Sequence, residues 1–240
     1  KQDLYTHQTP QILETLKQAA IIQSTESSNR IEGIEVLPER LKALMLHNSK
    51  PKDRPEAEII GYRDVLAKIH TQFDSIEVNP ETLQEFHKGI LKGTGLPSGM
   101  WKRKDNTIEE RLADVRWITR FVPVSARETP YYIQETCEQF DRLWAEGKIS
   151  KLLLIPSFVL DFLCIHPFTD GNGRISRLLT VLLLHKAGYE VGRYISLERT
   201  IEESKESYYD TLQRASQGWQ EGQHRIKPWW DYFLTVLLIC

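Results

Sequence analysis

The feature that most constrains this chain is a polar string between two apolar segments. Residues 152–165 are largely apolar, and aliphatic side chains recur at helical spacing from Ile175 to Leu183. Between them, residues 166–174 read His-Pro-Phe-Thr-Asp-Gly-Asn-Gly-Arg. This pattern predicts a loop between a buried helix and an amphipathic helix, and the second helix should begin within Gly171–Gly173.

The end of the string and the turn after it supply groups that bind phosphate. A helix N-terminus presents unpaired N–H groups and a positive dipole end, and glycines let an anion approach the backbone. Arg174 and Arg177 stand in the first turns of this helix, where cations are unfavourable unless an anion is bound. Asp170 would repel bare phosphate, but it fits as a ligand of Mg²⁺, which takes carboxylates together with substrate oxygens.

His166 lies just outside the same positive helix end. The field there disfavours imidazolium, so the ring should be neutral at neutral pH and able to accept a proton. A neutral base, a metal-binding carboxylate and an anion site together predict attack by a hydroxyl group or water on phosphorus. A simple helix–loop–helix turn would explain the glycines, but it would not explain the histidine, the carboxylate and the two arginines.

These residues resemble a known motif. The string and Arg177 match the active-site pattern HxFx(D/E)GNGRxxR of the Fic-domain family, and every fixed position is filled. Residues 99–108 are similar to the family's flap strand, and Arg120–Pro123 resembles the return of the flap. The helix around Tyr208-Tyr209 resembles the segment that closes the adenine pocket. The resemblance covers roughly residues 55–240.

The resemblance implies a mainly α fold, a Fic-type helical bundle with a small β-hairpin flap over the active site. It implies Mg²⁺-dependent transfer of AMP from ATP to a Ser, Thr or Tyr hydroxyl of a target protein, the chain itself included. His166 would be the catalytic base, and Asp170 would hold the metal. The implied ATP-binding and phosphate-binding residues are Phe168, Gly171, Asn172, Gly173, Arg174, Arg177, Tyr208 and Tyr209. The implied flap residues, which would align the target by strand addition, are Trp101, Lys102, Asn106 and Ile108.

The chain departs from the family pattern at two positions. Lys102 stands where the family often has arginine, and Ser216 stands where an asparagine often contacts adenine. The second departure leaves transfer of a different nucleotide open as an alternative.

A second motif lies near the N-terminus. Residues 28–33, Ser-Asn-Arg-Ile-Glu-Gly, resemble the family's inhibitory motif (S/T)xxxE(G/N). Periodicity predicts a helix from Pro10 to Ile31 that Gly33 ends, which places Glu32 at the negative helix end, where a carboxylate needs a cationic partner. The resemblance implies that Arg177 is this partner, that Ser28 supports the contact, and that the pair inhibits the enzyme. The alternative is an ordinary solvated carboxylate.

Other patterns describe the organisation of the chain. The expected division is an N-terminal helical extension carrying the inhibitory motif at 1–54 and a Fic domain at 55–240, which family members often continue with a winged-helix module. Proline and capping signals predict further helices at Pro38–Leu46, Glu56–Phe73, Glu81–Leu91 and Tyr131–Glu146. A β-pair is expected between Met100–Ile108 and Arg116–Val122, and Trp229, Trp230, Phe233, Val236 and Leu237 form a buried helix stripe.

Composition narrows the function classes. The net charge of −2, from 31 basic and 33 acidic residues, offers no basic surface for direct nucleic-acid binding. Three cysteines without CxxC spacing indicate neither a zinc site nor a disulfide framework and favour a cytoplasmic location. No segment is apolar over enough length to suggest a membrane partner. The acidic cluster Glu198, Glu202 and Glu203 is interpreted as a solvated helix face, and a homodimer is expected from the family alone.

Two further hypotheses stay open. One is the reverse chemistry, a de-AMPylating hydrolase in which Glu32 positions water. The other is a nucleotide-sensing regulatory module with little catalysis. The intact His166 argues against this second hypothesis, because a protein that only binds nucleotide needs no catalytic base. The target protein is not encoded in any pattern of the sequence.

Overall fold

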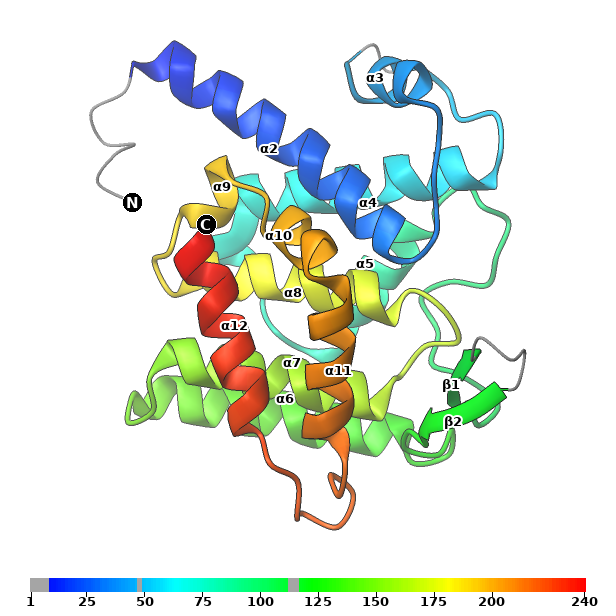
Figure 1. Cartoon of the computed structure of the whole chain (residues 1–240), viewed down its shortest axis with the longest axis vertical. Coiled ribbons are helices and arrows are strands. Elements are labelled where there is room, and N and C mark those ends of the chain that lie inside the picture. Colours follow the sequence, from blue (N-terminus) through cyan, green and yellow to red (C-terminus); the bar gives the residue numbers. More distant parts are fainter. Residues whose placement is uncertain (1–8, 47–48, 112–116) are drawn as a thin grey trace.

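The computed structural model describes residues 9–46, 49–111 and 117–240, and within them it is a helical bundle with one β-hairpin (Figure 1). The helices are α2 (Pro10–Ile31), α3 (Pro38–Leu46), α4 (Arg54–Gln72), α5 (Pro80–Ile90), α6 (Thr129–Glu146), α7 (Lys151–Ile165), α8 (Asn172–Lys186), α9 (Val191–Tyr194), α10 (Leu197–Glu203), α11 (Lys205–Ser216) and α12 (Lys227–Ile239). A short 3₁₀ turn, η1 (Phe73–Ser75), follows α4, and the hairpin consists of β1 (Ile108–Arg111) and β2 (Trp117–Phe121). The predicted fold class is confirmed.

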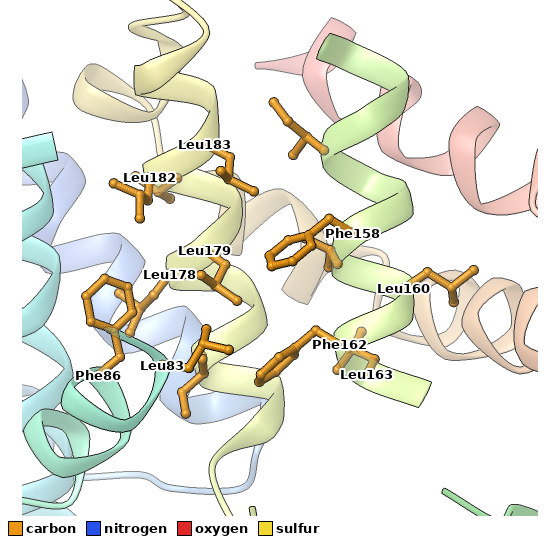
Figure 2. Packing of buried hydrophobic residues seen from close by; sticks show 14 of the residues in the cluster. Leu83, Phe86, Phe158, Leu160, Phe162, Leu163, Leu178, Leu179, Leu182 and Leu183 are labelled. Carbon is orange, nitrogen blue, oxygen red and sulfur yellow. The ribbon is translucent and has the colours of Figure 1, made fainter. Parts of the chain in front are cut away.

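Helix α8 is the centre of the bundle and packs against α7, α4 and α5. Figure 2 shows Leu178, Leu179, Leu182 and Leu183 between Phe158 and Phe162 of α7 and Leu83 and Phe86 of α5. Every residue from Arg174 to His185 is buried, so the prediction of an amphipathic helix was wrong. Helices on several sides cover α8, and its polar side chains must therefore find partners inside the protein.

Local signals set most helix ends. Thr9, Asp53 and Asn79 cap α2, α4 and α5 by accepting a backbone N–H, and a proline follows in the first turn of each helix. Helix α2 ends with bonds from Gly33 N to Arg30 O and from Ile34 N to Asn29 O, and Gly33 has φ 76°. This is a Schellman motif, which the sequence predicted through Gly33.

The hairpin is shorter than predicted. The segment from Trp101 to Thr107 is not a strand, and β1 begins only at Ile108, where a register shift separates Ile108 from Glu109. The earlier part of the segment instead packs on the loop after α7, where Lys102 N donates to Pro167 O. The predicted start of the return strand at Arg116 lies outside the described residues.

The last helix closes the bundle. Trp229, Phe233 and Val236 of α12 are buried, and Trp230 and Leu237 are half-buried, as the stripe predicted. Of the helices in the described ranges, none combines the length and apolar character needed to cross a membrane.

Four histidines have neutral rings, three of them buried and His166 half-buried. Burial lowers the pKa of His70 to about 3 and the pKa values of His87, His166 and His185 to about 4. His70 and His185 also share a hydrogen bond of 3.0 Å between Nδ1 and Nε2.

Stability should therefore fall as the pH is lowered from 6.5 towards 4. In this window the unfolded chain binds protons at these histidines and the native state does not, which lowers the free energy of unfolding by on the order of 1 kcal/mol per pH unit for each independent group. Urea unfolding followed by circular dichroism at pH 7 and pH 5 measures this. Equal stability at the two values would contradict the assignment of four neutral rings.

Candidate active site

The loop between α7 and α8 begins with a strained residue. His166 ends α7 with φ 50° and ψ 61°, and within the described residues it is the only non-glycine residue with positive φ. Its N–H donates to Phe162 O at 2.9 Å. A left-handed conformation costs a residue with a side chain about 1–3 kcal/mol, so the surrounding contacts must hold it.

The His166 ring is set up as a proton acceptor. Its Nδ1 lies 3.3 Å from Leu163 O, and because a carbonyl can only accept, the hydrogen belongs on Nδ1 and the lone pair on Nε2. Burial lowers the pKa to about 4, the bond to Leu163 raises it, and the Lys102 charge lowers it. The ring is therefore neutral at pH 7, as predicted, and burial is the largest cause of the lowered pKa.

Phe168 and Asn172 shape the rest of the loop. Phe168 is fully buried and stacks on His87 with centroids 4.0 Å apart, and Trp101 lies against it at 5.0 Å. The Asn172 side chain accepts from Phe168 N at 3.0 Å and donates to Phe168 O at 2.8 Å. The side chain of Asn172 thus braces the loop, which leaves its backbone as the part available to an anion.

Arg174 is buried in a charged network that reaches α4. Its Nη1 pairs with Glu58, and its Nη2 lies 3.5 Å from Asp170. Arg54 links the same two carboxylates, with Nε 2.5 Å from Glu58 and Nη2 3.2 Å from Asp170. Glu58 therefore balances the cation at the buried helix end while the Asp170 side chain stays half exposed.

Asp170 fits a magnesium site in which the substrate and water supply the other ligands. Its Oδ1 accepts from Gly171 N at 2.6 Å, and its side chain is 51% exposed at the mouth of the loop. Among the described residues, no group of three or more His, Cys, Asp or Glu side chains could hold a metal by itself. One carboxylate combined with phosphate oxygens and water matches how Mg²⁺ is commonly held.

The ion pair predicted between the two motifs is present. Arg177 Nη2 donates to Glu32 Oε1 at 2.7 Å and to Ser28 O at 2.9 Å, and Arg177 Nε donates to Ser28 Oγ at 2.8 Å. Burial by itself would lower the pKa of Arg177, but the Glu32 carboxylate and the neighbouring Tyr208 and Tyr62 raise it above its usual value. A Cβ added to Gly173 would collide with Glu32 Oε1, so this carboxylate lies directly over the start of α8.

One cavity of about 1310 Å³ brings part of the predicted site together. It is lined by the predicted residues Glu32, Ile108, His166, Gly173, Arg177, Tyr208 and Tyr209, and also by Ser216. Tyr208 is buried, and Tyr209 is 41% exposed. Outside this lining lie Ser28, Gly33, Trp101, Lys102, Asn106, Phe168, Asp170, Gly171, Asn172 and Arg174.

Sequence reasoning missed the residues that support the site from other helices. Glu58 pairs with Arg174, and the ring of His87 stacks on Phe168. No spacing along the chain connects Glu58 or His87 with the motif. Glu198 was wrongly placed on a solvated face: it is buried and accepts from Tyr62 Oη at 2.9 Å. An acidic residue among apolar neighbours, as Glu58 is between Ala57 and Ile59, is the one local signal that could have indicated a buried ion pair.

Known proteins resemble this chain over part of its length. The model of the Fic/DOC family matches residues 77–184, which contain the whole loop motif. This region of the chain is therefore similar to the Fic/DOC family. A Fic protein of Aedes aegypti named protein adenylyltransferase is 46% identical over 54 residues, which are 22% of this chain and 10% of the relative. The protein adenylyltransferase fic-1 of Caenorhabditis briggsae is 23% identical over 141 residues, 57% of this chain and 25% of the relative.

Solved Fic structures share the fold. A Fic-domain signaling protein from Bacteroides thetaiotaomicron superposes with a TM-score of 0.81 at 21% identity, covering 98% of this chain and 91% of the other. Fic-1 from C. elegans superposes with a TM-score of 0.71 at 19% identity, covering 96% of this chain and 64% of the other. The chain spans between a tenth and a quarter of the curated relatives it matches.

Removing Glu58 should destabilise the Fic fold. Glu58→Ala leaves the Arg174 guanidinium, 1% exposed, without its main counter-charge, which costs about 3–5 kcal/mol. Glu58→Gln should cost less because its amide oxygen still accepts a hydrogen bond. The matched control is Glu85→Ala, which removes the exposed pair with Lys68 and should cost under about 1 kcal/mol. Urea unfolding of the three variants measures this, and equal losses for Glu58→Ala and Glu85→Ala would contradict it.

Proposed function

We propose that this protein is a Mg²⁺-dependent adenylyltransferase that transfers AMP from ATP to a hydroxyl side chain of a protein, the chain itself included. The observation that carries the proposal is the shared cavity, which His166, the start of α8 at Gly173 and Arg177 line together. The two relatives named as protein adenylyltransferases support the choice of reaction. Residues 1–54 would be the regulatory extension and 55–240 the catalytic part.

In this mechanism the chain positions and activates the reactants. Nε2 of His166 takes the proton of the attacking hydroxyl group as its oxygen bonds to the α-phosphorus and pyrophosphate leaves. The N–H groups at the start of α8 bind the phosphate oxygens together with Arg177, and the buried Arg174 adds positive charge at the same helix end. Asp170 would hold Mg²⁺, which supplies positive charge to the phosphates when bound. The β1–β2 hairpin would align the target segment by backbone pairing.

Glu32 would inhibit this enzyme. Its carboxylate bonds the Arg177 group that a terminal phosphate needs, and it lies over Gly173, where anions would approach the backbone. Two negative groups cannot share this site without repulsion. ATP would therefore bind in a productive position only when Glu32 moves away or is removed.

A second candidate uses the same groups in reverse. The Glu32 side chain is 30% exposed and lines the cavity with His166, so it could position a water that removes AMP from a modified protein. Incubating an AMP-modified target with protein and Mg²⁺ in the absence of ATP separates the two reactions. A nucleotide sensor with little catalysis would show neither transfer nor removal of AMP. Its function in cells would be unchanged by His166→Ala.

Glu32→Gly should switch on transfer. Freeing Arg177 is expected to raise AMP incorporation at least tenfold, and adding His166→Ala should lower it by about 10²–10⁴-fold because the base is gone. Intact-mass analysis after incubation with ATP and Mg²⁺ detects the added adenylate, and EDTA should abolish it. The control Glu35→Gly removes a carboxylate three residues away that does not line this cavity. If Glu32→Gly incorporates no more AMP than Glu35→Gly does, the inhibitory role of Glu32 is wrong.

A further inference from the structure

Lys102 makes an unusual set of contacts for a lysine. Its side chain is buried to 3% exposure, and Nζ donates to Ile165 O at 3.1 Å and to Asn106 Oδ1 at 2.8 Å. Its backbone N–H donates to Pro167 O at 2.8 Å. Buried lysines are rare because desolvation of the ammonium group is unfavourable, so this arrangement needs a compensating reason.

The acceptors of Lys102 flank the strained base. Ile165 O and Pro167 O belong to the residues directly before and after His166, the residue with positive φ. Rotation of His166 back to the ordinary helical region would turn these neighbouring carbonyls away from their donors. Two bonds from one residue thus oppose relaxation of the conformation that aims the imidazole.

The same residue joins the loop to the flap. Asn106 lies two residues before Ile108, where β1 begins, and Trp101 beside Lys102 contacts the ring of Phe168. The segment before the hairpin is therefore bonded to the catalytic loop on both sides of His166. Burial lowers the pKa of Lys102 to about 8, with Asp105 opposing the shift, so the ammonium form is still available near neutral pH.

We propose that Lys102 is a positioning residue that holds His166 in its left-handed conformation and links it to the segment that leads into the β1–β2 hairpin. This inference rests on the proposed transfer reaction and adds a residue whose part in it is indirect. Lys102 does not line the cavity, so it acts on the histidine and not on the nucleotide.

The test compares Lys102→Met with Lys104→Met in the Glu32→Gly background. Lys104 is exposed on the same segment, so the control makes the same substitution without removing a buried donor. Misplacing a reacting group by about 1 Å can cost on the order of 10²-fold in rate, so Lys102→Met should lower kcat between about tenfold and a hundredfold. The KM for ATP should stay within about twofold, and Lys102→Arg, which restores the donor, should recover most of kcat.

A second measurement does not depend on activity. The His166 ring resonances, assigned with His166→Gln, should shift in the NMR spectrum of Lys102→Met and stay in place in Lys104→Met. If Lys102→Met retains the kcat and the ring resonances of Lys104→Met, or loses activity only through KM, the positioning role is wrong. If no variant transfers AMP but the resonances shift as expected, the proposed function fails while the structural role of Lys102 stands.

Discussion

Two guanidinium groups at the start of a helix that is buried on all sides determine much of this structure. Arg174 and Arg177 lie at the positive end of α8, where cations are unfavourable, and both are almost fully inaccessible to water. Each therefore requires a carboxylate, Glu58 on α4 for the first and Glu32 beside α2 for the second. The two partners differ in exposure, since Glu58 is 2% exposed and Glu32 is 30% exposed. One pair is built into the core, and in the proposed function the other would open.

In the proposed function, this difference would let one site be both stable and regulated. Breaking a buried pair is costly, so the Arg174–Glu58 contact belongs to the fold itself. Both residues of the Arg177–Glu32 pair line the cavity, and Glu32 directly precedes the glycine of the Schellman motif. In the proposed function, a phosphate that enters the cavity would compete with Glu32 for Arg177. The rest of α2 packs against α4 and α10, so the carboxylate could move without loss of the whole helix (Figure 1).

In this proposal, the catalytic geometry depends on a strained backbone conformation at His166 that contacts from other residues maintain. The His166 backbone is unfavourable by itself, and contacts from Phe162, Leu163 and Lys102 hold it. Phe168 and Asn172 close the loop behind it through packing and a pair of side-chain hydrogen bonds. The loop that carries the base is therefore contacted by α7, by the segment before the hairpin and by the first residue of α8.

The sequence by itself determined the helices, their caps and the contents of the loop, because periodicity, proline and capping residues act within a few positions of one another. It also predicted the Glu32–Arg177 contact, through the resemblance to a family motif. It overestimated the length of the strand at Met100 and took α8 to be amphipathic, since the environment of a segment is not encoded in its own pattern. Tertiary structure alone decided the partners of Arg174, Phe168 and Lys102. Those partners come from helices and loops up to 116 residues away, and which side chains meet follows from how the helices pack.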